Sequence, residues 1–83
     1  MTFLVVIPKK IKKKITKYPS DLQNKLMNKL DSLTGFPKSL DVKKIGEITY
    51  RIRTGDFRII IDVYFDKGVI EVVKLDVRGR IHY

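Results

Sequence analysis

The stretch YRIRTGDFRIIID, residues 50–62, has the alternation that decides the fold. Basic residues alternate in it with aromatic and aliphatic ones, which is the period of two expected of half-buried strands. Gly55 and Asp56 separate two such runs, and a glycine in the first of two central positions is typical of a type II′ hairpin turn. This turn would place Arg53 directly opposite Arg58. The hairpin would then have one apolar face and one cationic face.

Three consecutive strands are predicted from this hairpin onward, at 48–54, 57–65 and 69–78. The loop 66–68 ends in glycine, which suits a three-residue bulged turn. The resulting pairs would be Phe65 with Val69, Ile61 with Val73, and Arg58 with Asp76. Both hairpin registers bring apolar residues together, so each supports the other.

The first half of the chain predicts a strand and a helical hairpin. Residues 2–7, TFLVVI, are almost continuously apolar, so we expect a central strand. Helices are predicted at 9–18 and 20–34, because apolar residues recur there every three or four positions. Their buried stripes would be Ile11, Ile15 and Tyr18 in the first helix, and Leu22, Leu26, Met27, Leu30 and Leu33 in the second.

Local signals mark the boundaries of the second helix. Ser20 and Gln23 fit a capping box, in which each side chain satisfies a free backbone donor. Gly35 would close the helix in a left-handed conformation. Residues 36–47 have two turn signals and no sustained period, which indicates a connecting loop. Leu40, Val42 and Ile45 would hold this loop against the core.

Composition limits the class of protein. Eighty-three residues with 43% hydrophobic content indicate one folded domain spanning 1–83. Eighteen basic against nine acidic residues give a net charge of +9, which favours a polyanion or an acidic protein as partner. The chain has no cysteine, which rules out disulfides and thiolate metal sites. The apolar run 3–7 is too short to span a membrane, so we expect a soluble, cytoplasmic protein.

Lysines dominate the predicted first helix. Six of the ten residues from 9 to 18 are lysines, and two of them stand at the N-terminal end, where the helix dipole disfavours cations. A solvated helix face would explain such a run. Attraction of RNA phosphates would also explain it, and the unfavourable position favours this second interpretation. Lys9, Lys10 and Lys13 are therefore candidate phosphate-binding residues.

The cationic face of the predicted sheet is the main candidate site. Like charges directly opposed across a sheet are destabilising, and only Asp76 is expected to relieve the Arg53–Arg58 pair. One interpretation is that these arginines only solubilise an exposed hairpin. The alternative is a phosphate clamp, because guanidinium groups bind phosphate oxygens bidentately and stay charged. The candidate residues of this clamp are Arg51, Arg53, Arg58, Lys74 and Arg78.

The last residues add a group able to move a proton. His82 is the only histidine, and neighbouring arginines would lower its pKa and keep it neutral. Arg80 and Tyr83 stand beside it in the sequence. The RGRIHY segment could therefore supply a general acid or base to the clamp.

The order of elements, with YRIRTGDFRIIIDV and RGRIHY as its distinctive parts, resembles the RelE superfamily of toxins from type II toxin–antitoxin systems. The resemblance covers nearly the whole chain. It implies an α+β fold in which a helical hairpin packs on a small twisted antiparallel sheet, in the order β-α-α-β-β-β. It also implies a ribosome-dependent endoribonuclease that cuts mRNA in the ribosomal A site, needs no metal or cofactor, and is neutralised by an acidic RelB-like antitoxin that wraps it.

The resemblance assigns roles by position. Arg51 and Arg53 match two basic strand residues of the family, and Arg58 matches the arginine after the hairpin turn. Arg78 or Arg80 matches an arginine near the C-terminus. The Arg-x-His-Tyr ending resembles the YoeB branch, which makes His82 or Tyr83 the candidate for proton transfer. No residue matches the glutamate base of that branch by motif, although Asp41 and Glu47 lie in about the right region.

Two other function classes remain open from the sequence. ParE-like inhibitors of DNA gyrase share the fold, although the short RIHY ending disfavours this assignment. A nucleic-acid-binding module without catalysis would need only the lysines and arginines. Its RNA binding would be steeply salt-dependent and unchanged by His82→Ala.

Overall fold

A five-stranded mixed sheet forms the centre of the computed structural model, which describes residues 2–37 and 41–77. The spatial strand order is β1-β5-β4-β3-β2. The strands are β1 (Leu4–Val6), β2 (Asp41–Lys44), β3 (Thr49–Thr54), β4 (Phe57–Tyr64) and β5 (Val69–Val77). The helices are α1 (Lys9–Ile15) and α2 (Ser20–Asp31), and α2 continues into the 3-10 turn η1 (Ser32–Gly35).

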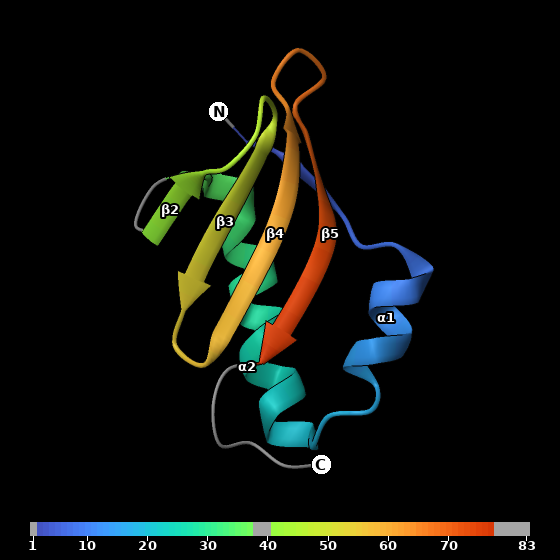
Figure 1. Ribbon diagram of the computed structural model, residues 1–83. Coiled ribbons are helices and arrows are strands. Elements are labelled where there is room, and N and C mark those ends of the chain that lie inside the picture. The colour runs from blue at the N-terminus through green and yellow to red at the C-terminus, as the bar shows by residue number, and fades with distance from the viewer. Residues whose placement is uncertain (1, 38–40, 78–83) are drawn as a thin grey trace.

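The helices cover one face of the sheet. In Figure 1, α2 lies behind β3, β4 and β5, and α1 lies beside the β5 edge. The α+β class and the helical hairpin on a sheet are therefore confirmed. The sheet is not wholly antiparallel, however, because β1 runs parallel to β5.

The first strand occupies an edge of the sheet and not its centre. Within β1, the side chains of Leu4 and Val6 are 65% and 40% exposed. The apolar run predicted a central strand, but only Phe3, just before the strand, is buried. The Phe3 ring packs edge-to-face on Phe36 and Phe65, with centroids 6.1 and 5.9 Å apart.

Strand β2 corrects the prediction of a loop over 36–47. It pairs antiparallel with β3 and places Val42 opposite Ile52, which packs Val42 against the core. Ile45 does not join the core, because its side chain is 49% exposed, and Leu40 lies outside the described residues. A strand of four residues with one inward apolar side chain is too short to show a clear period.

The hairpin between β3 and β4 has the predicted register. Arg53 is paired with Arg58, and Gly55 adopts a φ of 56°, as the first central position of the turn requires. The L-residues rarely adopt this backbone conformation, because their Cβ would approach the following carbonyl oxygen.

The register of the second hairpin differs from the prediction over half its length. Tyr64, not Phe65, is paired with Val69, and Ile61 is paired with Val72. A bulge between Ile60 and Ile61 then leaves Val73 without a direct partner and 47% exposed. The turn shifts the pairing by one residue from the prediction, and the extra residue of the bulge shifts it back. Arg58 therefore lies opposite Asp76, as predicted.

The helices bury the predicted stripes but end differently. Apart from Met27, which is 39% exposed, all the apolar residues predicted for the two helices are buried. Pro19 takes the N-cap position of α2, and the Gln23 side-chain amide donates to the Tyr18 carbonyl at 2.7 Å instead of closing a capping box. Gly35 ends a 3-10 turn without a positive φ, so it is not a left-handed cap. No described helix has the length and apolar character needed to cross a membrane.

Candidate nucleic-acid interface

The sheet face turned away from α2 carries the predicted arginines in two cross-strand rows. Strand pairing places one residue from each of β2, β3, β4 and β5 side by side in each row. The first row is Asp41, Arg53, Arg58 and Asp76, and the second is Lys43, Arg51, Ile60 and Lys74. We call these residues the arginine face. The strands of Figure 1 show this face toward the viewer.

Two arginines are opposed at the centre of the first row. Arg53 and Arg58 are register partners and both are exposed. Within residues 2–37 and 41–77, neither forms an ion pair with a carboxylate. Their guanidinium groups are consequently available to an anion, at the cost of mutual repulsion.

Carboxylates flank this arginine pair on both sides. The sequence predicted only Asp76 as a counter-charge, but β2 brings Asp41 opposite Arg53. The carboxylate of Asp76 contacts lysines, since its oxygens lie 3.4 Å from Lys14 Nζ and 3.9 Å from Lys74 Nζ. Asp41 was missed as part of this row because β2 was not predicted, although the alternation Asp41, Val42, Lys43 was a weak signal of it.

Arg51 is less exposed than Arg53 and Arg58. Its side chain is half-buried between Lys43 and Ile60 in the second row, and its Nε is buried without a hydrogen bond in the described structure. A buried donor without a partner is costly, which marks Arg51 as a strained point of this face. Lys43 adds a cation to this row that sequence reasoning did not assign to the site.

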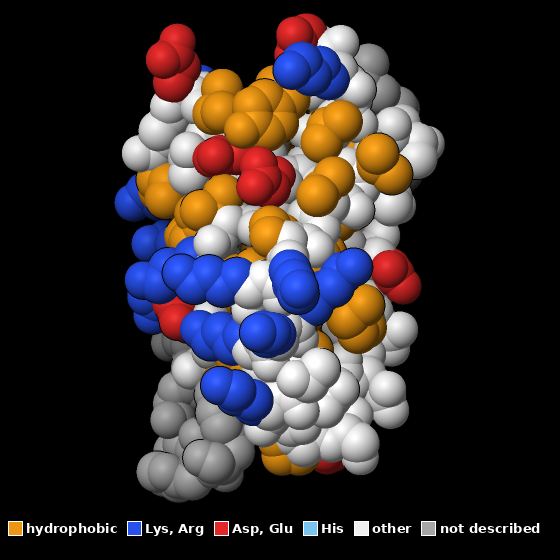
Figure 2. Space-filling model, turned by 90° about the vertical axis from the view of Figure 1, so that its right-hand side faces the viewer, with side chains coloured by type: hydrophobic (Ala, Val, Ile, Leu, Met, Phe, Trp, Pro, Cys, Tyr) orange, Lys and Arg blue, Asp and Glu red, His pale blue; other side chains and the backbone are white. Residues whose placement is uncertain are grey.

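The lysines of α1 form a second basic surface. Lys9, Lys10 and Lys13 line a groove of about 920 Å3 between α1 and β5. Its remaining lining residues are Ile11, Lys14, Lys17, Val73, Lys74 and Leu75. Lys74 belongs both to this lysine groove and to the arginine face, so the two surfaces meet there. In Figure 2, the blue side chains form a band across this side of the molecule.

Lys14 joins α1 to the sheet at this junction. Its ammonium group donates to the Leu75 carbonyl and lies beside Asp76. Because the bulge at Val73 turns both Val73 and Lys74 outward, the lysine groove has an aliphatic side chain beside its cations.

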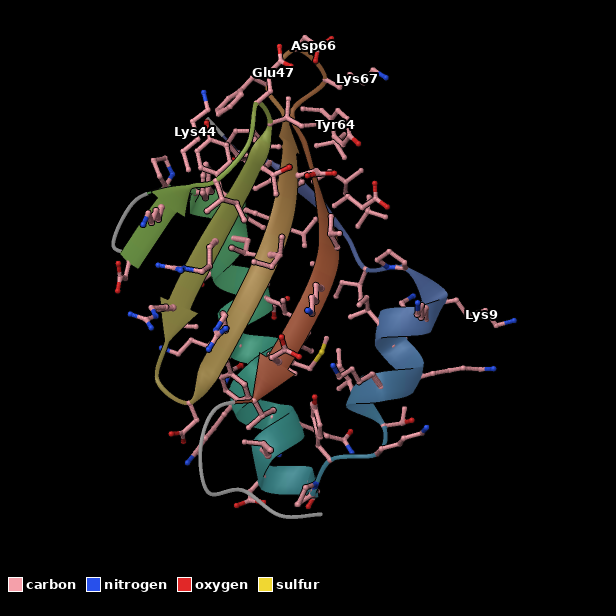
Figure 3. The ribbon with its side chains drawn as sticks, in the orientation of Figure 1. Lys9, Lys44, Glu47, Tyr64, Asp66 and Lys67 are labelled. Carbon is pink, nitrogen blue, oxygen red and sulfur yellow. The ribbon has the colours of Figure 1, made fainter. Side chains whose placement is uncertain are left out.

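Several predicted residues lie outside the described part of the chain. These are Arg78, Arg80, His82 and Tyr83, so their positions relative to Arg58 are untested. Glu47 lies at the far end of the sheet, near Asp66 and Lys67 in Figure 3, and not beside the arginines. No group of three or more His, Cys, Asp or Glu side chains suited to a metal occurs within the described ranges.

Replacing Arg58 by glutamine is expected to raise the free energy of unfolding by about 0.2–1 kcal/mol, because the change removes one of two opposed cations, while Asp76 on its other side keeps its contacts with Lys14 and Lys74. Urea denaturation would measure the gain, which should shrink at high salt. Lys25→Gln, on the exposed side of α2, is the matched control for the lost charge. An equal gain in both variants would show that net charge, and not the cross-strand pair, is responsible.

Comparisons with known proteins identify structures that share the fold of this chain. No family model and no curated protein matches the chain. Solved structures do match. The archaeal RelE–RelB complex of Pyrococcus horikoshii contains a chain that is 32% identical, with 98% of this chain and 100% of that chain covered at a TM-score of 0.80. The isolated Escherichia coli RelE toxin is 21% identical, with 98% and 88% covered at a TM-score of 0.72.

A third match extends the same fold to a more distant sequence. The RelBE2 complex of Mycobacterium tuberculosis contains a chain only 15% identical, with 94% of this chain and 100% of that chain covered at a TM-score of 0.81. The architecture is that of a RelE-like toxin. With 32% identity over almost its full length to the Pyrococcus protein, this chain belongs to the RelE family of type II toxins.

Proposed function

We propose that this protein is a ribosome-dependent endoribonuclease, which acts in the cytoplasm, cleaves mRNA in the ribosomal A site and thereby inhibits translation. The observation that carries the proposal is the opposed pair Arg53 and Arg58, exposed on a sheet face with Arg51 and Lys74 beside it. A sheet selected for stability alone would avoid this pairing. Family membership gives the arrangement its context.

The proposed reaction begins at a ribose 2′-OH. A base removes the hydroxyl proton, and the oxygen attacks the adjacent phosphorus. The bond from phosphorus to the 5′-oxygen breaks, an acid protonates that oxygen, and a 2′,3′-cyclic phosphate remains on the other product. No metal or cofactor is needed for these steps.

The residue roles follow from where charge develops. Negative charge on the phosphorane-like transition state would be stabilised by fixed cationic donors, which is the role of Arg58 together with Arg80. Arg51, Arg53, Lys74 and Arg78 would hold neighbouring phosphates. Proton transfer is assigned to His82 or Tyr83, because arginine stays protonated at any accessible pH.

A protein antitoxin is the proposed regulatory partner. The related archaeal and bacterial RelE chains were solved in complexes with RelB. A net charge of +9 on this chain favours an acidic partner that covers the arginine face. The partner would stop cleavage by keeping mRNA away from the arginines.

Cleavage by the purified protein is expected only on mRNA that ribosomes are translating. Primer extension on a reconstituted translation reaction would locate the cuts, with the same mRNA lacking ribosomes as the control. An Arg58→Ala, His82→Ala double variant should neither cut mRNA nor arrest growth on expression. Inhibition of translation with intact mRNA would refute the enzyme assignment, and DNA breaks with intact mRNA would indicate gyrase as the target.

A further inference from the structure

The lysine groove has a chemistry different from that of the arginine face. All its charged lining residues are lysines, and its uncharged lining is aliphatic: Ile11, Val73 and Leu75. Val73 is the member of this apolar set that reaches the solvent, at 47% exposure, because the β5 bulge turns it outward. The long lysine stems add further hydrocarbon to the walls.

Most of the groove's cations have no acidic partner. Among the described residues, ion pairs involve only Lys14 and Lys74, which share Asp76. Lys9 and Lys13 stand one helical turn apart on α1, and Lys9 extends outward from the start of the helix in Figure 3. Like charges at this spacing repel, and no acidic residue occurs in the first turn of α1 to offset them.

The lining favours an acidic peptide over RNA. RNA bases bind in protein grooves by stacking on aromatic rings or guanidinium planes. The groove is lined by neither, whereas the arginine face offers three guanidinium groups, those of Arg51, Arg53 and Arg58. Lysine ammonium groups act as point charges that suit carboxylates at varied angles, and an exposed valine suits a branched aliphatic side chain.

We propose that the lysine groove is the docking site for an acidic amphipathic segment of a protein partner, with carboxylates on the lysines and an aliphatic side chain on Val73. RNA would then bind the arginine face alone. That this partner is the antitoxin rests on the proposed function. That its docking segment is acidic and amphipathic rests on the lining of the groove alone.

A peptide of alternating glutamate pairs and single leucines is the probe, with a second peptide that has serine in place of leucine. Fluorescence anisotropy with the purified chain should show the leucine peptide binding about tenfold more tightly, because an aliphatic side chain is buried on binding. Lys9→Gln with Lys13→Gln should weaken both peptides at least about fivefold at low salt. Lys25→Gln with Lys29→Gln removes two charges at the same helical spacing in α2 and should change binding less than about twofold.

The Val73→Thr variant tests whether the ligand of the lysine groove is a peptide or RNA. This nearly isosteric change at a half-exposed position should weaken the leucine peptide and leave the serine peptide unchanged. A single-stranded oligouridine should lose no more affinity in the lysine-groove variants than in Lys25→Gln with Lys29→Gln, and it should lose clearly more in Arg51→Gln with Arg58→Gln. If Lys9→Gln with Lys13→Gln instead weakens oligouridine and not the peptides, the groove binds RNA and the proposal fails.

Equal losses in the α1 and α2 lysine variants would show an unspecific charge effect and would also overturn the proposal. None of these measurements depends on mRNA cleavage. A chain that binds the peptide but cuts no mRNA would refute the proposed function and leave the docking site standing. A chain that cuts mRNA but does not bind the peptide would refute the docking site and leave the proposed function standing.

Discussion

Replacing Arg58 by alanine is expected to reduce the rate of mRNA cleavage on translating ribosomes by about 10²–10³-fold, the usual effect of losing one preorganised donor to a transition state. Arg58 is exposed, lies opposite Arg53 and Asp76, and forms no ion pair among the described residues. Its removal should therefore leave the fold intact. Single-turnover cleavage measured by primer extension would give the rate.

Two further variants decide whether the shape of the guanidinium matters. Arg58→Lys keeps the charge but loses the bidentate fork, so its rate should fall between those of wild type and Arg58→Ala. Lys25→Ala, a cation lost from the exposed side of α2, should cleave like the wild type. If Arg58→Ala reduces cleavage no more than Lys25→Ala does, Arg58 has no part in the chemistry.

Truncating Leu30 to alanine is expected to lower the free energy of unfolding by about 2–5 kcal/mol, a large share of the stability of a domain of this size. Leu30 is fully buried on the side of α2 that faces the sheet, so the change leaves a cavity. Urea denaturation followed by circular dichroism would measure the loss.

Met27→Ala in the same helix is the control for helix propensity. The Met27 side chain is 39% exposed, so its truncation should cost clearly less than that of Leu30. Similar losses in the two variants would contradict the placement of the core between α2 and the sheet. The control matters because Met27 was predicted to belong to the buried stripe.

The sequence predicted best where a period extended over many residues. The alternation through β3 and β4 and the glycine turn between them defined the register that opposes Arg53 and Arg58. The helical stripes predicted the buried leucines of α2 equally well. In both cases one face of the element is buried, so every residue along it follows the same periodic rule and adds to the signal.

Short and irregular elements were the ones that sequence reasoning missed. Strand β2 has a single inward apolar residue, Val42. It is a strand because it pairs with β3, and a short stretch of sequence does not show which other segment it will pair with. The β5 bulge adds one residue without any glycine or proline to mark it, so Val73 was predicted to face Ile61 but has no direct partner and is exposed. The apolar β1 was predicted to be central, because hydrophobicity alone does not show whether a strand has one neighbour or two.

The candidate site was predicted in outline and completed by tertiary pairing. Arg51, Arg53, Arg58 and Lys74 share one face as expected. Asp41 and Lys43 joined them only through β2. The predicted roles of Arg80, His82 and Tyr83 stay predictions, since these residues lie outside the described ranges.

The row Asp41, Arg53, Arg58 and Asp76 has a consequence for how far its attraction reaches. Its two positive charges stand between two negative ones, so the row as a whole is electrically neutral. A neutral arrangement of this kind has a field that fades over a few ångströms, well within the Debye length of about 8 Å at physiological salt. Approach of a polyanion from a distance would thus be governed by the excess of lysines elsewhere on the chain. The arginine pair acts only at contact. There it would bind a phosphate placed between the two guanidinium groups in preference to a surface that is only negatively charged.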